Sequence, residues 1–378
     1  DEIPQAFTEA MLAGDGADVL VNTETLREAM RIYTVKQAFV DLRDAFGDIL
    51  LPCVQSAYVD PNGALYSVPL NMYLSMPVTL ETTLPSDTAL TLDVMYDLAE
   101  RAEQNGDFLF TPNGTPGFGS FTDNFFAAAV PSFAKEETGE CFYDSEEFGK
   151  LLTFLETVRD RIAGDEMAFT YQYGDYSLES DVLLDALRSG EVTFLDFPFC
   201  TIDAYAILKQ LYGGNTFALH GYPSQDKEIV RFRSDIDISL NAASKVQLGA
   251  AQFIAYLLSD TIQLFSADTV LPVTTSAIEA LLATPTFVYT PDTMERLDTS
   301  YSAEILELVY PEALRITYDE DDLAAVRTLL YNTETTVNID TTVQTIINEE
   351  MSAYRAGVRS LAQAQKIMQS RLWIYINE

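Results

Sequence analysis

Few motifs of enzyme chemistry occur in this chain of 378 residues. His220 is the only histidine, so a Ser-His-Asp triad or a histidine-rich zinc site could rest only on it. It lies in a strand pattern beside Gly221, where we expect a hydrogen-bonded structural histidine. Cys53, Cys141 and Cys200 are too far apart for a CxxC motif, and we expect three buried thiols. We therefore predict no catalytic residue, no cofactor and no metal site.

Acidic side chains leave one enzymatic alternative open, because paired carboxylates serve glycosidases. The largest acidic cluster, residues 319–322, stands at an expected helix start, where acids complement the helix dipole. Overall, 58 acidic residues oppose 22 basic ones and give a formal net charge of −36. No Lys/Arg cluster interrupts this excess, so nucleic acid is excluded as a partner. We interpret the acidity as a source of solubility.

Aromatic residues are more informative, since 20 Tyr and 22 Phe occur and several adjoin expected turns. Most must belong to the core. Those at strand ends are different, because ligands in open α/β sheets bind outside the carboxyl ends of strands. Short polar side chains at the same ends can supply hydrogen bonds. The candidate ligand-binding residues chosen in this way are Asn22, Thr23, Asn71, Tyr73, Phe121, Asp123, Asp196, Phe197 and Phe199.

The stretch 235–277 indicates the kind of scaffold that positions these residues. Alternating apolar residues predict a strand over 236–240, and apolar spacing of three and four predicts a helix over 246–258 that docks on a sheet. Asn241 and Ser244, between them, can accept hydrogen bonds from free helix N–H groups. A strand therefore feeds a helix, as in an α/β lobe.

Residues that typically begin or end helices and strands predict further elements. Thr91 should cap a helix that Gly106 closes, and the pairs Thr317 with Glu320 and Ser360 with Gln363 match the capping box. Further helices are expected over 5–13, 144–162 and 181–188, and strands over 18–21, 64–69 and 191–197. The chain is too long for one core, which predicts two lobes, and it has no apolar run of about 18 residues.

Three phrases, over 62–70, 236–273 and 360–378, resemble the extracellular solute-binding proteins of ABC importers, family 1, the group that includes maltose-binding protein. The last phrase is similar to the C-terminal helix of clostridial-type lipoproteins of this family. The resemblance covers nearly the whole chain. It implies an α/β, two-lobed, periplasmic-binding-protein-like fold (type II) with a hinge and an interlobe ligand cleft. The crossover phrases then predict lobe 1 over 1–72 and 223–283, and lobe 2 over 73–222 and 284–378.

The family resemblance also implies a function without catalysis. The protein would capture a solute, expected to be a carbohydrate, and deliver it to the membrane permease of an ABC importer. It would be a monomeric, extracellular, cell-surface lipoprotein whose signal and anchor are not in this chain. Asn338 is a further candidate, because relatives pass a loop over the cleft there. A binder of peptides or amines with the same fold, a sensor subunit and a secreted hydrolase stay open as alternatives.

Two departures from the family pattern qualify these expectations. The chain opens inside a helix, where relatives have a preceding first strand, so the first-lobe sheet should lack that strand or receive a replacement. Trp373, the sole tryptophan, lies in the last expected helix, so no candidate loop offers an indole as a sugar platform.

Overall fold

In the computed structural model, the strand and helix expected over 235–277 are β11 (Asp237–Leu240) and α10 (Gln247–Leu257). Asn241 and Ser244 were expected to accept hydrogen bonds from free helix N–H groups, and this prediction was wrong in detail. Their side-chain oxygens accept hydrogen bonds from the backbone N–H groups of Ala243 and Val246, at 2.9 and 3.1 Å. They therefore hold the turn between strand and helix rather than capping the helix, because both bonds close before its first residue.

The structure describes most of the chain in segments. The described residues are 2–14, 16–22, 26, 38–60, 62–110, 121–135, 138–158, 181–202, 204–225, 227–267, 269–283, 286–288, 315–317, 319–336 and 341–377.

The chain forms two units, each assembled from several segments. Unit 1 consists of Asp1–Leu74, Phe199–Ala206 and Phe232–Val337. Unit 2 consists of Ser75–Pro198, Ile207–Arg231 and Asn338–Glu378. These units differ from the predicted lobes at four places, since residues 73–74, 199–206 and 284–337 fall in unit 1 and residues 223–231 in unit 2. Three of the boundaries fall inside the strands β3, β7 and β10, which therefore carry the chain from one unit to the other.

Unit 1 is built on a three-stranded sheet in the order β1-β11-β2. The central strand β11 pairs antiparallel with β1 (Val19–Asn22) on one side and with β2 (Val68–Pro69) on the other. The helices and minor strands of this unit are α1 (Glu2–Ala13), α3 (Arg43–Phe46), the 3-10 helix η1 (Gly47–Ile49), α4 (Pro52–Tyr58), α11 (Asp260–Gln263), α12 (Thr275–Leu282), β12 (Thr286–Val288), β13 (Arg315–Thr317), α15 (Glu320–Asn332) and β14 (Thr335–Thr336).

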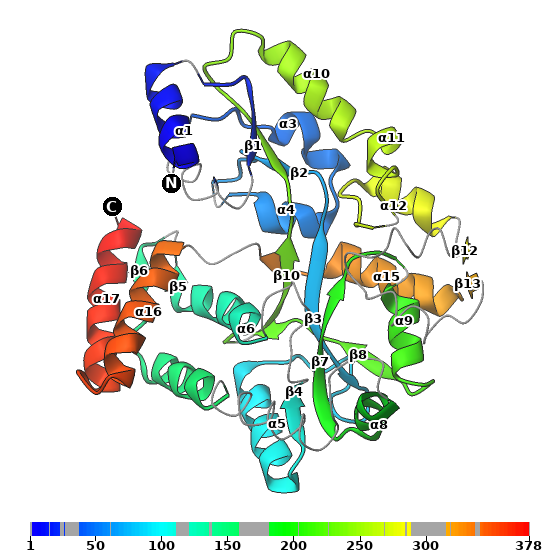
Figure 1. Ribbon diagram of the computed structural model, residues 1–378, viewed down its shortest axis with the longest axis vertical. Helices are drawn as coiled ribbons and strands as arrows, with labels where there is room; N and C mark the ends of the chain where they lie inside the picture. Colours follow the sequence, from blue (N-terminus) through cyan, green and yellow to red (C-terminus); the bar gives the residue numbers. More distant parts are fainter. Residues whose placement is uncertain are drawn as a thin grey trace. The chain divides into compact units, whose positions relative to one another are not determined.

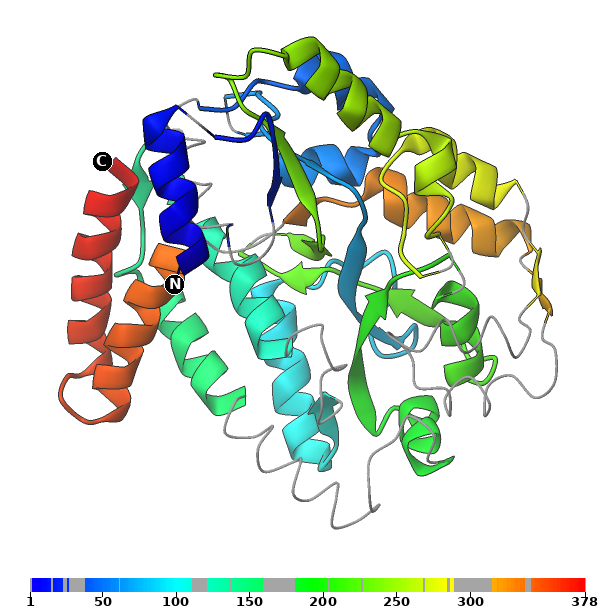
Figure 2. The ribbon, with the colours of Figure 1, turned by 45° about the horizontal axis from the view of Figure 1, so that its top comes forward.

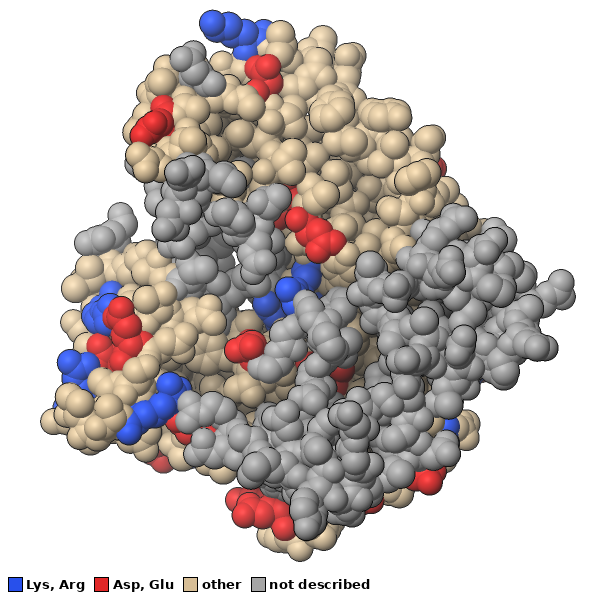
Figure 3. Space-filling model, in the orientation of Figure 1, with Lys and Arg blue, Asp and Glu red and all other residues tan. Residues whose placement is uncertain are grey.

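Helix α10 follows β11 and precedes α11 and α12 in a row (Figure 1). Only part of the apolar stripe expected on it is buried. Ala250 and Ile254 are buried, whereas Val246 and Phe253 are exposed. Helix α10 contains no charged residue, and the surface along it is uncharged in the space-filling view (Figure 3).

Unit 2 contains most of a larger sheet, with the strand order β14-β10-β3-β7-β4, β8 beside β3 and β9 beside β10. Strands β4 and β7 run parallel, with Phe110 opposite Phe194. The bounds are β3 (Tyr73–Leu80), β4 (Phe108–Phe110), β7 (Val192–Phe199), β8 (Phe217–Leu219), β9 (Tyr222–Pro223) and β10 (Glu228–Arg233). A small hairpin is formed by β5 (Ala134–Lys135) and β6 (Glu140–Cys141).

Two helices of unit 2, α5 and α17, begin at the capping residues predicted from the sequence. Thr91 caps α5 (Leu92–Asn105) by accepting a hydrogen bond from the Val94 N–H, and Gly106 ends it with φ of 77°. The capping box of Ser360 and Gln363 is confirmed by reciprocal hydrogen bonds of 2.9 and 3.3 Å. The remaining helices are α6 (Phe121–Ala129), η2 (Val130–Phe133), a helix over 146–158, α8 (Asp181–Ser189), α9 (Ala204–Leu211), α16 (Thr341–Arg355) and α17 (Leu361–Asn377), with α9 beginning in unit 1.

The capping box expected from Thr317 and Glu320 was wrong by two residues. Asp319 is the N-cap of α15, and its carboxylate accepts a 2.8 Å hydrogen bond from the Asp322 N–H. Asp322 returns the bond by accepting one of 3.1 Å from the Asp319 N–H. An aspartate at the cap reaches this geometry as well as threonine does, so the acidic run itself sets the helix start.

Helices α16 and α17 lie side by side and form a hairpin (Figure 2). Glu350 of α16 is buried, and its carboxylate binds the guanidinium groups of Arg359 and Arg371. Charged side chains gather over these two helices in the space-filling view (Figure 3). Within the described segments, no helix combines the length and the apolar character needed to cross a membrane.

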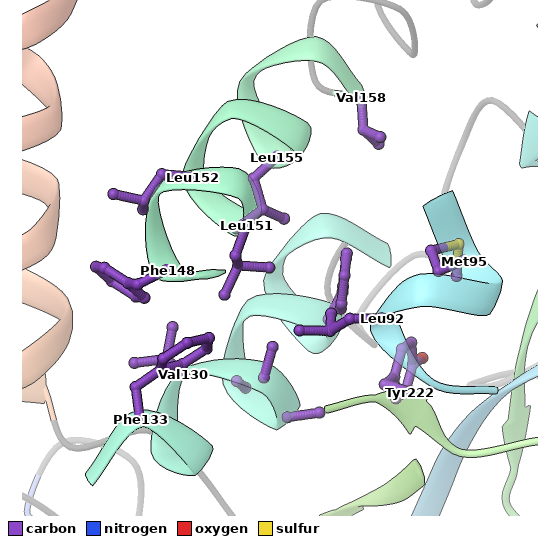
Figure 4. Packing of buried hydrophobic residues seen from close by; sticks show 14 of the residues in the cluster. Leu92, Met95, Val130, Phe133, Phe148, Leu151, Leu152, Leu155, Val158 and Tyr222 are labelled. Atoms are coloured by element: carbon purple, nitrogen blue, oxygen red, sulfur yellow. The ribbon is translucent and has the colours of Figure 1, made fainter. Parts of the chain in front are cut away.

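The core of unit 2 is aromatic and lies among α5, α6, helix 146–158, α16 and α17. Phe148 is 0% exposed and points toward Phe133 and Val130 (Figure 4). Its ring lies 5.0 Å from that of Phe133 and 5.1 Å from that of Tyr143, both edge to face. Such pairs add about 0.5–1.5 kcal/mol beyond area burial.

We predict that Phe148→Ala lowers the free energy of unfolding by about 3–5 kcal/mol, because it removes both ring contacts and leaves a cavity. Urea unfolding monitored by circular dichroism measures this. Phe142→Ala is the matched control, since Phe142 lies six residues away and is 41% exposed. A loss at Phe142 as large as that at Phe148 would contradict this account of the core.

Candidate ligand-binding site

One end of the three-stranded sheet of unit 1 gathers three of the residues chosen from the sequence. Strands β1 and β2 both run antiparallel to β11, so their carboxyl ends lie at the same end of the sheet. Asn22 is the last residue of β1, and Asn71 and Tyr73 follow the end of β2. Asp237, the first residue of β11, stands opposite Asn22. Strand ends of this kind are where open α/β sheets bind ligands.

Asp235 connects Asn71 and Tyr73 at this sheet end. The Asn71 Nδ2 donates to Asp235 Oδ2 at 3.1 Å, and the Tyr73 hydroxyl donates to the same oxygen. Asn71 Oδ1 accepts bonds from the Asp235 N–H at 3.0 Å and from the Ser234 hydroxyl at 3.2 Å. Burial, reinforced by the hydrogen bond to Asp235, raises the pKa of Tyr73 well above its ordinary value. The Tyr73 hydroxyl therefore stays protonated at neutral pH.

Asn22 and Asp237 add oxygen acceptors beside this network. Asn22 is 7% exposed, and its Oδ1 atom has no hydrogen-bond partner in the part of the chain that the structure describes. Asp237 is buried and accepts a 2.5 Å hydrogen bond from the Tyr58 hydroxyl. A buried carbonyl oxygen without a partner is uncommon in native proteins and suits a donor from a ligand. The sheet end is therefore suited to a molecule that carries hydroxyl or amino groups.

A second polar group lies at strand β7 of unit 2. Asp196 is 6% exposed, accepts a hydrogen bond from the Tyr222 hydroxyl and accepts one of 3.4 Å from Asn124 Nδ2. Burial raises the pKa of Asp196 to about 7, although both hydrogen bonds oppose that shift. Burial and the neighbouring Asp196 charge raise the pKa of Tyr222 well above its usual value. Asp196 therefore changes its charge near neutral pH.

Aromatic rings surround this second group. Phe121, at the start of α6, stacks on Phe110 with ring centroids 3.7 Å apart and lies 5.4 Å from Tyr222. Phe110 in turn stacks on Phe194 at 5.9 Å. Phe110 ends β4 and stands opposite Phe194, the third residue of β7, so these rings lie at the carboxyl end of β4 and near the start of β7. Phe121 itself is buried among them.

The other predicted ligand-binding residues lie in different surroundings. Phe197 and Phe199 are fully buried in β7, and Phe199 falls in unit 1. Asp123 is exposed in the first turn of α6. Thr23 and Asn338 lie outside the described residues.

The sequence reasoning did not select Asp235, Asp237, Tyr58, Asn124 or Tyr222. A signal existed for two of them, because Asp235 and Asp237 alternate with the apolar residues that open the strand at 236–240. Period-two alternation places such residues together on one face.

His220 and the three cysteines, the residues considered for catalysis, are buried as structural residues are. His220 is 1% exposed, with its Nδ1 3.2 Å from Glu228 Oε2 and its Nε2 3.3 Å from the Leu84 carbonyl oxygen. The predictions of a hydrogen-bonded structural histidine and of three buried thiols are confirmed. Among the described residues, no group of three or more His, Cys, Asp or Glu side chains is arranged to hold a metal ion.

No family model and no curated protein matches the sequence. Several solved structures, however, are similar to this one. The chain is similar to the maltose/maltodextrin-binding domain MalE from Bdellovibrio bacteriovorus bound to maltotriose, with 14% identity and a TM-score of 0.51, over 100% of this chain and 89% of that chain. It is also similar to an extracellular solute-binding protein family 1 from Alicyclobacillus acidocaldarius, with 13% identity and a TM-score of 0.48 over 99% and 87% of the two chains. A third similar structure is an ABC transporter solute binding protein from Thermotoga lettingae bound with alpha-D-tagatose, with 12% identity and a TM-score of 0.48 over 100% and 89%.

The similarity to MalE shows the fold. The chain has the α/β fold of the MalE structure, so the fold class predicted from the sequence is confirmed.

Asp196 generates a prediction about pH. Folding raises its pKa from 3.8 to about 7, so between these values the folded protein holds a proton that the unfolded chain has released. Its contribution to the free energy of unfolding therefore falls as the pH rises from about 4 to about 7, by a few kcal/mol in order of magnitude. Asp196→Asn removes this titration. We expect the melting temperature of the variant to fall less than that of the wild type across this pH range, and an identical fall would contradict the assignment.

Tyr222→Phe should act on the same titration in the opposite way. The Tyr222 hydroxyl bond lowers the pKa of Asp196, so its removal raises that pKa further. The fall in melting temperature should then extend to higher pH than in the wild type. Differential scanning calorimetry at a series of pH values distinguishes the two variants, and a window shifted to lower pH would refute the role of this hydroxyl.

Proposed function

We propose that this protein is the solute-binding component of an ABC importer and that its solute is a carbohydrate. The observation that carries the proposal is the group of Asn22, Asn71, Tyr73 and Asp235 at one sheet end, in a chain with the fold of MalE. The MalE structure is described as bound to maltotriose. Sugars present many hydroxyl groups, each of which can donate and accept a hydrogen bond, and the sheet end offers matching groups.

The polar side chains at the sheet end of unit 1 are the proposed contacts with the solute. In unit 1 they are Asn22, Asn71 and Tyr73, with Asp235 holding the last two in place. Asp123, Asp196, Phe121, Phe197 and Phe199 stay candidate contacts on the sequence alone, and of these only Asp123 is exposed. Thr23 and Asn338 belong to the same proposal on the sequence alone.

The remaining parts of the proposal concern setting and partners. The protein would act outside the cell as a lipid-anchored monomer, deliver its solute to a membrane permease and catalyse no reaction. The fold supports the binding role, because the similar MalE structure is described as a maltose/maltodextrin-binding domain. A secreted hydrolase remains the alternative from another class. Incubation with oligosaccharides followed by chromatography of the products separates the two, since a binding protein releases its ligand unchanged.

A ligand screen tests the solute class. Maltotriose and other neutral oligosaccharides, spermidine and a tripeptide are each added to the full chain at millimolar concentration. A ligand that binds the native state alone raises the melting temperature by mass action. We expect a shift with at least one sugar and none with spermidine or the tripeptide. Shifts with the amine or peptide but with no sugar would overturn the carbohydrate assignment.

We predict that Tyr73→Phe weakens binding of that sugar about tenfold. The substitution keeps the ring but removes the hydroxyl that donates to Asp235, and a hydrogen bond to a charged group is worth about 1.5–3 kcal/mol. Isothermal titration calorimetry measures the change. Tyr66→Phe is the matched control in the same unit, where the lost hydroxyl only accepts a 3.4 Å bond from Asn62 Nδ2. Equal affinities of Tyr73→Phe and wild type would remove Tyr73 from the site.

A further inference from the structure

A cavity lies within unit 2, and Asp196, Asn124 and Tyr222 are not among the residues that line it. It has a volume of about 600 Å³, within the range of small-molecule sites. Its walls come from α5, from the helix described over 146–158 (Figure 4) and from the first turns of α17, and Leu109 of β4 also lines it. These elements all belong to one unit, so the cavity does not depend on the placement of the other.

An aromatic pair forms one wall of this cavity, which we name the α5 pocket. Tyr96 and Phe154 both line it, with ring centroids 4.8 Å apart and planes inclined by 58°. Phe125 supports Phe154 from the core, edge to face at 5.8 Å. Ala99 and Leu361 complete an apolar surface around the rings. A flat apolar or aromatic ring is the natural complement of this wall.

The hydroxyl of Tyr96 is the second independent observation. It is inaccessible to solvent, and the described residues provide no hydrogen-bond partner for it. Burial raises the pKa of Tyr96 to about 12, so the hydroxyl is neutral and can donate or accept at physiological pH. A buried polar group without a partner is uncommon in native proteins, and a small movement of the Tyr96 side chain toward the cavity would let a ligand supply the partner.

The charges that line the α5 pocket favour a cation. The carboxylates of Glu100 and Glu103 on α5 have no hydrogen bond or ion pair within the described residues, whereas Glu146 forms a 3.5 Å salt bridge with Lys150 on the helix opposite. The lining therefore has a net charge of minus two. The formal charge of −36 on the whole chain also repels anions and attracts cations at a distance.

We propose that the α5 pocket binds a small organic amine, with an apolar ring against Tyr96 and Phe154 and its ammonium group toward Glu100 and Glu103. Aromatic faces attract ammonium groups as well as apolar rings, so the two parts of the wall act together. This site is separate from the proposed sugar contacts and does not depend on them. Its occupant would either be a second ligand or a regulator of the first.

Isothermal titration calorimetry of the full chain with tryptamine tests the proposal. Indole-3-acetate, which has the same ring and the opposite charge, is the ligand control. We expect one tryptamine site and no binding of indole-3-acetate under the same conditions. No heat with tryptamine, or equal affinity for both compounds, would overturn the proposal.

Variants of the lining residues test where the amine binds. The double variant Glu100→Gln/Glu103→Gln should lower tryptamine affinity at least tenfold, and Tyr96→Phe, which keeps the ring, should lower it several-fold. Asp97→Asn is the matched control, because Asp97 is an exposed acid of the same helix that does not line the pocket. Should the double variant fail to fold, Tyr96→Phe decides the question alone.

A final comparison separates this site from the sugar site. Asn71→Ala should leave tryptamine affinity unchanged, and maltotriose should not displace the amine. If Asn71→Ala abolishes tryptamine binding while the pocket variants do not affect it, the amine binds at the sheet end and the α5 pocket is not its site. Failure of every sugar to bind would refute the proposed function without affecting this result.

Discussion

The antiparallel pairing of β11 with β1 and β2 is the constraint on which the candidate site depends. It places the carboxyl ends of two strands at one end of the sheet, with Asn22 and Pro69 both opposite Asp237. The chain segments that follow β2 and precede β11 then meet, which allows Asp235 to bind both Asn71 and Tyr73. No single one of these segments forms a site alone, because the contacts join residues more than 160 positions apart in the sequence.

In unit 2 the corresponding constraint is the burial of a carboxylate. Asp196 lies in a strand that is buried along its whole length, and Tyr222 and Asn124 provide the hydrogen bonds that its burial requires. Both donors belong to other elements, β9 and α6, so a polar network fixes these elements around β7. The same burial makes the charge of Asp196 sensitive to pH near neutrality.

Local signals in the sequence predicted local structure well. Thr91 and Gly106 bound α5, and Ser360 with Gln363 begins α17, because such caps depend on residues within one turn of each other. Where two local solutions compete, the prediction was wrong, as at Asp319, which replaces Thr317 as the cap. The sequence predicted tertiary packing less well, since Val246 and Phe253 follow helical apolar spacing and yet are exposed. The partners Asp235 and Tyr222 were not selected, because their contacts depend on sheet register and not on spacing.

Hydrogen–deuterium exchange of the full chain, with and without the sugar that raises the melting temperature most, tests the central claim most directly. The account predicts that sugar slows exchange of backbone amides around Asn22, at residues 70–73 and at residues 235–237. These segments converge at the sheet end. A bound sugar that leaves all three segments unchanged and protects other parts of the chain would contradict the account.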